Sequence, residues 1–575
     1  MKRTLIVFWL VNLILLGYMP VQPVTSAPGT STPKISGTSQ QARQQETYAF
    51  ATSTFRLVFN RFNVPGDGYA TGIRELRYVP TGKTILMHER PTTIANADSP
   101  SWAFPVSASV AEVSPNERNL TVSFLSGKSI TMRVTSHARF LEFQLLEVTG
   151  DCGEIWLFGP IFLGLRPEDW PGWDPVIRSE YNQITYLGDD YYAGLIAADS
   201  NTYPARHWEE PTSVFIRAIS PPELPTPGGY RRNQRFAFFI AREEDLTSIV
   251  GEVEAYFDYP YGVALKGHRE NDIDYLFLID ETYVSAQDII ELAQEMGVGA
   301  VLLYQGFWSA WREPDEAFKL RDWTLEVVNS LQAAGLMVGL HAYAHLVPME
   351  GYYATHYPES VSTCDFDGFR SMDWTSTLPD RVAQDLAAKV ERLRPEWLYL
   401  DGQGPLYECQ PTSYDTYLDG RQTTAVLQAL RRRNYDNLKV FQDAGGTLTY
   451  HFTSRIGQTD YWDESSSHRT PIEHMNFTAS QVIHRERGLY RHTDLGWFGR
   501  EIHIPGGRRD ARWEEWQHLA STSLTHNIPI GIRTTYNDFM SDPLRFQVSA
   551  LLRETIRARR GRPGYRLYFP MGLKP

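Results

Sequence analysis

Cysteine and basic residues are scarce in this chain, and each scarcity excludes a class of protein. Only three cysteines occur among 575 residues, Cys152, Cys364 and Cys409, which is too few for a disulfide scaffold. Lys and Arg number 55 against 68 Asp and Glu, so the formal net charge is −13. Because nucleic-acid binding depends on clustered Lys and Arg that neutralise phosphates, this balance argues against a nucleic-acid partner.

Long apolar runs are also scarce, and the one clear case lies at the N-terminus. Two basic residues precede an apolar core from Leu5 to Leu16, and small residues follow at 25–27. This order is typical of a secretory signal, so we predict a signal peptide over residues 1–27 and a secreted, periplasmic or cell-surface protein. The run is short for a membrane span, although uncleaved anchoring is the alternative. Residues 28–47 are rich in Ser, Thr, Pro and Gln and are interpreted as a disordered leader.

The periodicity of apolar residues divides the rest of the chain into two parts. Residues 48–265 contain short alternating runs such as "SITMRVTSH" and "QRFAFFIAR", a pattern that predicts a β-sandwich domain. From residue 266 onwards, strand-like runs alternate with amphipathic stretches, and eight β-then-α units fit into roughly 280 residues. We therefore predict a multidomain β plus α/β protein, with an N-terminal β-sandwich followed by a (β/α)8 (TIM) barrel over 266–575.

The expected barrel strands end in polar and aromatic residues. These strands are "YLFLID", "AVLLYQ", "MVGLHAYAH", "WLYLDG", "LKVFQD", "GQTDYW", "TDLGWFG" and "IPIGIRTTY", of which the sixth is the least regular. Chemistry in such a barrel occurs at the C-terminal ends of the strands. Aromatic residues make up 13% of the chain, which suits either sugar-binding surfaces or large β-rich cores. Because polar groups and flat aromatic faces gather at one rim, the natural ligand is a carbohydrate.

Two of these strand ends resemble a known group of enzymes. In "WLYLDGQG" an apolar strand ends at Asp401-Gly402, and in "SRIGQTDYWD" Arg455 precedes Asp460. These motifs resemble those of the clan-D-type retaining α-galactosidases and α-N-acetylgalactosaminidases. The resemblance covers the barrel half and implies a (β/α)8 barrel in which Asp401 is the nucleophile and Asp460 the acid/base residue. A β-sandwich before the barrel also occurs in part of that group.

The chain departs from the family pattern at three places. Tyr399 stands where the family usually has Lys, two residues before the nucleophile. The second expected strand ends in Gln305-Gly306, where the family usually has paired acids. Only a helix and a short tail follow the eighth expected strand, where the family usually has a C-terminal β-domain. The sugar, its anomeric configuration and exo or endo action are left open by these motifs.

Taken together, the pattern and the resemblance predict a secreted glycoside hydrolase that cleaves an oligo- or polysaccharide with retention. Such enzymes need two carboxyl groups about 5–5.5 Å apart on either side of the anomeric carbon. Asp401 is expected to attack this carbon, and Asp460 to protonate the leaving oxygen and then deprotonate water. Asp463 and Glu464 are close enough in sequence to Asp460 to take the acid/base role.

The remaining rim residues are expected to bind substrate. The predicted set is Asp280, Trp308, His341, Tyr343, His345, Asp443, Trp462, Asp463, Trp497 and Arg533. Among them, Trp308, Trp462 and Trp497 are expected to stack on sugar rings. Asp280, His341, His345 and Arg533 are expected to bind hydroxyls or an acidic substituent. The alternatives are core packing for the tryptophans and for one of the two histidines, and turn or helix-cap roles for the aspartates. We expect neither a cofactor nor a metal, and the oligomeric state is left open.

Several alternatives follow from "GLHAYAH" and from the cysteines. In a strand, His341, Tyr343 and His345 share one face, and with Asp280 or Asp401 they suit a divalent metal in a metal-dependent carbohydrate hydrolase or deacetylase. Tyr343 and His345 also suit the acid and base of a polysaccharide lyase. A non-catalytic carbohydrate-binding barrel is a further alternative. Cys364 and Cys409 lie in two expected rim loops, so a disulfide between them is open.

Overall fold

The computed structural model defines two groups of sheets. It describes residues 47–60, 73–87, 95–97, 105–124, 127–149, 155–157, 183–188, 190–198, 203–205, 217–220, 235–258, 273–343, 346–361, 368–372, 376–401, 422, 425–435, 438–443, 455–457, 470–473, 475–476, 497–499, 502–504 and 507–561. The expected signal peptide, all but the last residue of the expected leader, and the three cysteines lie outside these ranges. No helix within the described ranges is long and apolar enough to cross a membrane.

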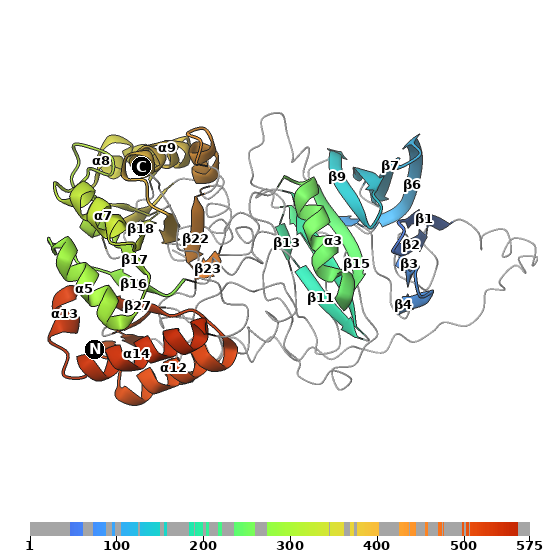
Figure 1. Cartoon of the computed structure of the whole chain (residues 1–575). Coiled ribbons are helices and arrows are strands. Elements are labelled where there is room, and N and C mark those ends of the chain that lie inside the picture. Colours follow the sequence, from blue (N-terminus) through green and yellow to red (C-terminus); the bar gives the residue numbers. More distant parts are fainter. Residues whose placement is uncertain are drawn as a thin grey trace, which may run out of the picture. The chain divides into compact units, whose positions relative to one another are not determined.

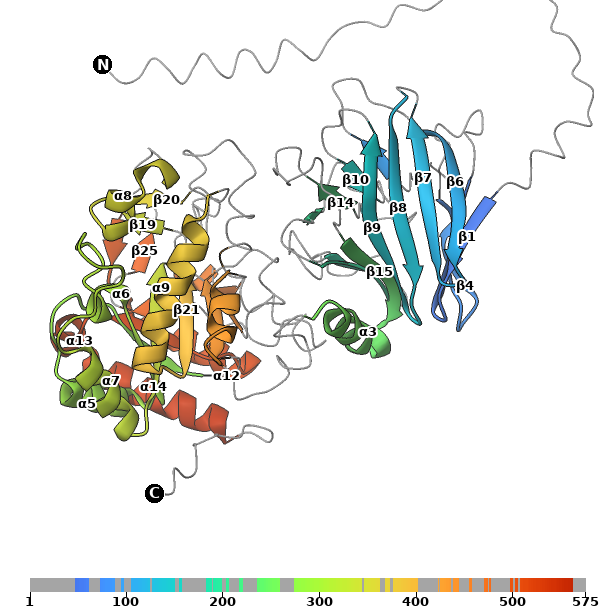
Figure 2. The same cartoon turned by 90° about the horizontal axis from the view of Figure 1, so that it is seen from above.

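The N-terminal part consists of antiparallel sheets. A four-stranded sheet contains β1 (Thr47–Ala51), β2 (Phe55–Asn60), β3 (Ile73–Tyr78) and β4 (Lys83–Met87) in that order. A seven-stranded sheet has the order β11 (Gln183–Gly188), β12 (Tyr191–Ala197), β15 (Arg235–Arg242), β9 (Phe140–Thr149), β8 (Ser129–Ser136), β7 (Glu117–Phe124) and β6 (Pro105–Ser114). A third sheet has the order β13 (Tyr203–Ala205), β14 (Arg217–Ser220), β10 (Ile155–Leu157) and β5 (Ala95–Ala97). Figure 2 shows β9, β8, β7 and β6 side by side.

Alternating side chains explain how these strands bury one face. Buried and partly exposed residues alternate along β7 and β8, where Leu120 lies opposite Met132. By contrast, β15 is buried on both faces, and helix α3 (Glu243–Tyr256) packs against it. One hydrophobic core contains residues of the four-stranded sheet, the seven-stranded sheet and α3, with Phe55 edge-on against Phe238 at 5.4 Å. The sheet of β1 to β4, the seven-stranded sheet and α3 therefore fold around a single core.

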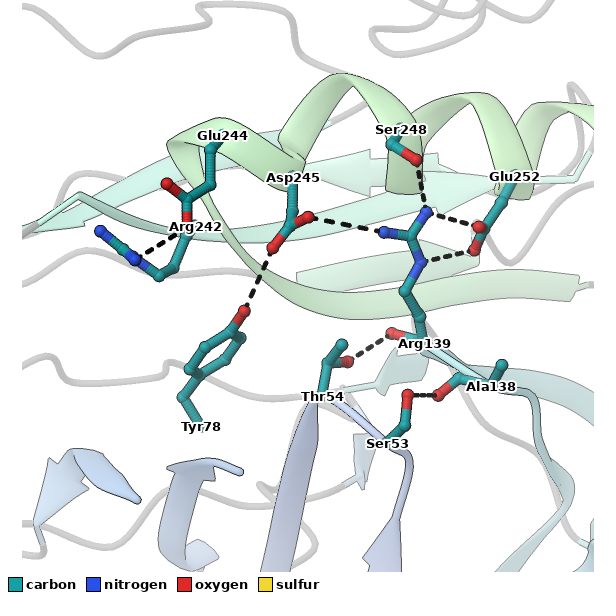
Figure 3. A network of polar contacts seen from close by, with 10 residues as sticks. All are labelled: Ser53, Thr54, Tyr78, Ala138, Arg139, Arg242, Glu244, Asp245, Ser248 and Glu252. Atoms are coloured by element: carbon teal, nitrogen blue, oxygen red, sulfur yellow. Dashed lines mark hydrogen bonds and ion pairs between the residues drawn. The ribbon is translucent and has the colours of Figure 1, made fainter. Parts of the chain in front are cut away.

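A polar network joins the same three elements (Figure 3). Arg139 directly precedes β9 of the seven-stranded sheet. Its guanidinium group donates to Ser248 and Glu252 of α3 and forms an ion pair with Asp245. The Thr54 hydroxyl donates to the Arg139 carbonyl oxygen at 3.0 Å. The Tyr78 hydroxyl donates to Asp245 at 3.4 Å. These contacts fix α3 to both sheets.

The C-terminal part is built on an eight-stranded sheet with parallel pairings. Its order is β23 (Arg455–Gly457), β22 (Lys439–Asp443), β21 (Trp397–Asp401), β18 (Met337–Tyr343), β17 (Ala300–Leu303), β16 (Tyr275–Leu278), β27 (Gly531–Thr534) and β24 (Trp497–Gly499). The first strand in sequence, β16, pairs with the second, β17, and also with the last, β27. Two short hairpins are β19 (Leu346–Pro348) with β20 (Phe369–Ser371) and β25 (Ile502–Ile504) with β26 (Gly507–Arg509).

Helices follow most of these strands and lie around the sheet (Figure 1). They are α5 (Ala286–Met296), α6 (Gln305–Trp308), α7 (Thr324–Ala333), α8 (Tyr352–His356), η4 (Pro358–Ser360), α9 (Leu378–Leu393), α12 (Trp513–His526), α13 (Tyr536–Met540) and α14 (Arg545–Arg560). On α9, for example, Val382, Leu386 and Val390 recur at helical spacing and are buried. These side chains belong to a core that also contains the outward-facing Leu276 and Leu278 of β16.

The opposite face of the sheet carries a second, aromatic core. Its members are Ile273, Tyr275, Phe277, Ala300, Leu302, Trp397, Tyr399 and Phe441, which alternate along the strands with the residues of the first core. Gly339 lies opposite Trp397, and a Cβ atom at Gly339 would lie 2.2 Å from the indole ring. A glycine on one strand therefore makes room for a tryptophan on the next.

One expected strand begins earlier in the structure than the sequence pattern predicts. The sequence pattern predicts the sixth strand over "GQTDYW", whereas β23 covers Arg455–Gly457 and pairs with residues 441–443 of β22. Only Ile456 in this strand is aliphatic, so the alternation of apolar residues gave no signal for it. Asp460, Trp462 and the neighbouring Asp463 and Glu464 lie beyond β23 and outside the described residues.

Candidate active site

The adjacent strands β18 and β21 bring an aspartate and a histidine together. His341 lies opposite Tyr399, and Tyr343 opposite Asp401, so these four side chains project from the same face of the sheet. The Nε2 atom of His341 lies 2.7 Å from Oδ2 of Asp401, within hydrogen-bond distance. The side chain of His341 is 1% exposed and that of Asp401 is 14% exposed. Asp401 is therefore a carboxyl group at the end of a strand, with a buried polar partner.

Aromatic rings surround the imidazole of His341. Phe277 stacks on it with ring centroids 5.0 Å apart, and Tyr399 lies nearly parallel to it at 6.1 Å. Tyr304 packs at 5.2 Å, and the ring of Tyr343 stands edge-on at 5.0 Å. Because neighbours on three strands restrict rotation of the imidazole, the direction of its Nε2 atom is fixed by packing.

Side chains of the short helix α6 form hydrogen bonds with the backbone of β18. The Trp308 indole N–H donates to the carbonyl oxygen of His341 at 2.8 Å. The Tyr343 backbone N–H donates to Oε1 of Gln305 at 2.6 Å. The Thr324 hydroxyl in turn donates to the Trp308 carbonyl oxygen at 2.9 Å. These hydrogen bonds hold both ends of the segment that carries His341 and Tyr343.

The prediction that Trp308 stacks on a sugar ring is wrong for this structure. Its indole is fully buried and packs against Phe318 at 5.9 Å. The sequence showed an aromatic residue just after a strand, but the residues after Leu303 turn into helix α6, which directs this ring into the core.

A second aromatic group lies next to Tyr343. The indole of Trp311 stacks on Tyr343 at 5.4 Å, and Phe369 packs on both rings at 4.9 Å. The hydroxyl groups of Tyr304 and Tyr343 lie 3.4 Å apart. The guanidinium group of Arg312 lies over the Trp311 ring at 5.1 Å. Tyr343, a predicted site residue, thus joins the Asp401–His341 pair to this aromatic group.

Tyr304 and Phe369 were not among the predicted site residues. Tyr304 follows Leu302 at strand spacing, so the period of two that defines the inner face of β17 was a usable signal for it. Phe369 lies on β20, far from the parallel sheet in sequence, and nothing local in the sequence indicated its contacts.

The two tyrosines at the site are held in the neutral form. Burial, followed by the nearby charge of Asp401, raises the pKa of Tyr343 well above its ordinary value. Burial also raises the pKa of Tyr304 to about 12; the hydroxyl of Tyr343 opposes this rise, and the carboxylate of Glu281 adds to it. Both phenols therefore keep their protons at neutral pH and can donate hydrogen bonds, but neither is suited to act as a base.

Arg533 projects toward the same group of residues. It pairs with Phe277 on one side and with Gly499 on the other, and its side chain is partly exposed. The pairing with Phe277 puts Arg533 on the inner face of the sheet, and its positive charge opposes the rise in the pKa of Tyr343. The structure thus brings Asp401, His341, Tyr343 and Arg533 of the predicted set together.

The carboxyl group of Asp280 is hydrogen-bonded to the protein backbone and is not open to a ligand. The residue is 5% exposed, and its Oδ2 accepts a hydrogen bond from the Tyr536 backbone N–H at 2.8 Å, at the start of α13. Burial raises the pKa of Asp280, and the hydrogen bond from Tyr536 opposes that rise. The observed contact is that of a residue joining the end of β16 to a helix, so the predicted binding of sugar hydroxyls has no support here.

Of the remaining predicted residues, two lie in described strands and the others lie outside the described ranges. Trp497 begins β24 opposite Gly531, which pairs in turn with Tyr275, the first residue of β16. Its backbone therefore lies at the start of the strands and not at their carboxyl ends, which corrects its predicted position at the rim. Asp443 ends β22, opposite Gly457 of β23. His345, Asp460, Trp462 and Asp463 lie outside the described residues, and their roles stay predictions.

No group of three or more His, Cys, Asp or Glu suited to holding a metal ion occurs in the part of the chain that the structure describes. The metal-dependent alternative depends on His345, which lies outside that part, so it stays untested.

The fold resembles that of solved glycoside hydrolases. No protein-family model matches the chain, and no curated protein matches it in sequence. A GH36 α-galactosidase of Geobacillus stearothermophilus aligns with a TM-score of 0.52 and 9% identity over 90% of this chain and 86% of that chain. The α-galactosidase of Lactobacillus brevis aligns at 0.51 and 11%, over 90% and 84%. The α-N-acetylgalactosaminidase of Bifidobacterium bifidum aligns at 0.51 and 10%, over 89% and 93%. The distant resemblance expected from the motif that ends at Asp401 is therefore confirmed at the level of the fold.

Proposed function

We propose that this protein is a glycoside hydrolase that acts with retention and uses Asp401 as its nucleophile. The observation that carries the proposal is the position of Asp401. Its carboxyl group ends a buried strand, has a buried histidine at 2.7 Å, and lies near the aromatic group of Tyr304, Tyr343 and Trp311. The fold that holds this carboxyl group is shared with solved α-galactosidases.

Galactosides are the first substrates to try. One of the Geobacillus structures was solved with 1-deoxygalactonojirimycin. Two others carry an aspartate substitution, one to asparagine with raffinose bound and one to alanine with stachyose bound. By analogy, we propose that the substrate of the present chain is an oligo- or polysaccharide with an α-linked galactose or N-acetylgalactosamine. In the present chain, Gln305 stands at the end of the second strand, where the family usually has paired acids. Its Oε1 atom accepts a hydrogen bond from the backbone N–H of Tyr343, so this position does not indicate which sugar is preferred.

In the proposed reaction, the described residues have distinct tasks. Asp401 attacks the anomeric carbon and forms a glycosyl-enzyme, which water then hydrolyses. Tyr304 and Tyr343 remain neutral phenols that donate hydrogen bonds. Arg533 contributes positive charge on the same side. We propose Asp460 as the acid/base residue, with Asp463 or Glu464 as its alternatives.

The architecture proposed for this function is a β-sandwich over residues 48–265 and a (β/α)8 barrel over 266–575. Seven parallel pairings already join the eight strands into an order in which the first and last strands are neighbours, as a closed barrel requires. We further propose that residues 1–27 direct secretion, on the basis of their sequence alone.

Replacement of the nucleophile tests this function. Wild-type protein and the Asp401→Ala variant would be assayed on 4-nitrophenyl α-galactoside and α-N-acetylgalactosaminide, together with a panel of other aryl glycosides. We expect the variant to lose about 10⁴-fold or more in kcat. Added azide should restore turnover and yield a glycosyl azide of inverted anomeric configuration. Asp315→Ala, which removes an exposed carboxylate, is the matched control and should retain activity.

Two results would reject the proposal. Full activity of Asp401→Ala would remove Asp401 from the reaction. Binding of glycans by wild-type protein without any cleavage would favour the non-catalytic barrel. In the lyase alternative, Tyr343 stays protonated at neutral pH and suits the acid but not the base, so that reaction needs His345 as its base.

A further inference from the structure

We propose that His341 is the positioning residue of the nucleophile, and that it orients Asp401 from the neighbouring strand. This inference rests on the proposed function. It replaces the expectation that His341 binds sugar hydroxyls, because the Nε2 atom that would do so lies 2.7 Å from Oδ2 of Asp401. The imidazole is 1% exposed, which leaves almost no surface for a ligand.

The imidazole is fixed in place before any substrate binds. Phe277 and Tyr399 pack on its ring, at 5.0 and 6.1 Å, and Tyr304 adds a third contact. The carbonyl oxygen of His341 accepts a hydrogen bond from the buried indole of Trp308. A side chain held by both its ring and its backbone can keep a carboxylate in one orientation, which is what a nucleophile aimed at a single carbon atom needs.

Both departures from the family motif at these strand ends meet at β18. Tyr399 fills the inner-face position where the resemblance expects Lys, and its ring packs on His341. Gln305 stands where paired acids are expected, and its Oε1 atom accepts the backbone N–H of Tyr343. The polar support of Asp401 therefore comes from β18, and α6 supports β18 in turn.

The chemical consequence concerns which oxygen of Asp401 reacts. With Oδ2 engaged by His341, the bond to the anomeric carbon is assigned to Oδ1. As that bond forms, the glycosidic C–O bond breaks and the leaving oxygen takes a proton from the acid/base residue. His341 neither gains nor loses a proton in this step. Its hydrogen bond keeps the carboxylate in place.

The first experiment compares two kinds of substrate. α-Galactosyl fluoride needs no protonation of its leaving group, whereas an unactivated α-galactoside such as raffinose does. We expect His341→Phe, which keeps a ring but removes the donor, to lower kcat about 100-fold on both substrates with KM changed less than about threefold. His341→Gln retains an N–H donor and should lose no more than about tenfold.

Two kinetic outcomes would overturn the inference. A loss on raffinose with normal hydrolysis of the fluoride would assign His341 to proton delivery. A rise in KM with unchanged kcat would assign it to substrate binding. Thermal unfolding of each variant identifies any loss that comes from misfolding, and the His341→Gln variant keeps the comparison valid if the Phe variant does not fold.

The second experiment does not depend on activity. In protein labelled with ¹⁵N-histidine, the ring signals missing from the His341→Gln spectrum belong to His341. Asp401→Asn should move these signals, while the control Asp315→Asn should leave them in place. Unmoved signals in Asp401→Asn would refute the pairing. If wild-type protein cleaves no glycoside but its His341 ring signals move on Asp401→Asn, the proposed function fails and the pairing of His341 with Asp401 is supported.

Discussion

At the scale of single residues, the pKa of a buried carboxyl group in this protein depends on the side chains around it. Glu142 on β9 is 5% exposed and accepts hydrogen bonds from the Arg235 guanidinium and, at 2.7 Å, from the Tyr256 hydroxyl. Nε2 of His137 lies 3.6 Å away. Burial by itself raises the pKa of Glu142, but the nearby His137 imidazole and the hydrogen bonds from Tyr256 and Arg235 outweigh it and lower the pKa from 4.5 to about 2.

This shift predicts a pH-dependent contribution of Glu142 to stability. Because the folded pKa is lower than the unfolded value of 4.5, the contribution is complete above pH 5 and is lost as the pH falls toward 2. The shift corresponds to at most about 3 kcal/mol. We expect Glu142→Gln to melt well below wild type at pH 7 and the difference to shrink steadily toward pH 2, as measured by calorimetry. A difference that is the same at both ends of this range would contradict the assignment.

At the scale of elements, neighbouring strands constrain one another through the size of their side chains. Gly339 of β18 and Trp397 of β21 are direct neighbours on the inner face of the sheet. The tryptophan fills the space over the glycine and packs edge-on against Tyr275 at 5.2 Å. The spacing of β18 and β21, and so the pairing of His341 with Asp401 further along the same strands, depends on this fit.

Adding one methyl group at Gly339 should disturb both stability and the site. In Gly339→Ala, the new Cβ atom would lie 2.2 Å from the Trp397 ring, so the ring or the strand must move. We expect a loss of about 1–3 kcal/mol in urea unfolding. Trp397→Leu in the same chain should restore part of it.

The control for this change is Gly299→Ala, directly before β17 of the same sheet. There the new Cβ atom would approach only the end of the Arg560 side chain, at an ordinary 3.4 Å. This variant should stay close to wild type. Equal losses at the two glycines would show that packing against Trp397 is not the cause.

How well the sequence predicts each strand depends on the length of its apolar run. The strands around Phe277, Val301, Leu340 and Leu398 lie where the apolar pattern expects them, because each is a run of buried residues on both faces. For the three-residue strand β23 the apolar pattern placed the start too late, because so short a run carries no periodicity, whereas β24 lies within the run expected for it. Helix α6 was not expected either, although it supports the site.

At the scale of the whole molecule, a buried ion pair joins the first strand of the eight-stranded sheet to the last helix. Asp274 directly precedes β16, and Oδ2 of its carboxyl group pairs with the guanidinium group of Arg559 on α14. Both side chains are fully buried. Oδ1 of Asp274 accepts the backbone N–H of Ile530 at 3.0 Å, next to the start of β27. The pair therefore holds together segments more than 250 residues apart in sequence.

Removing the charge of Asp274 should destabilise the C-terminal part of the chain. Asp274→Asn keeps an oxygen for the Ile530 N–H but leaves the guanidinium group of Arg559 buried without its counter-charge. We expect a loss of about 3–5 kcal/mol, measured by urea unfolding. The double variant Asp274→Leu, Arg559→Met removes both charges and should lose less than Asp274→Asn does. A single variant as stable as wild type would show that the pair is solvated in solution.

The sequence by itself determined which faces of the strands are apolar and which strand ends carry chemical groups. An apolar run that stops at Asp401 is a local pattern, and the alternation of strands and helices from residue 266 onwards is a repeat of such patterns. The fold likeness to solved α-galactosidases agrees with the alternation of strands and helices. Local spacing also predicted that His341 and Tyr343 share one face, as they do.

Only the tertiary structure decided what each of these groups contacts. His341 meets Asp401 because two parallel strands, separated in sequence by a hairpin and several helices, pair in one register. Trp308 is buried because its strand turns at once into α6, and Asp280 is occupied by the backbone of α13. Register and packing arise from the whole set of long-range contacts, so no local pattern encodes them.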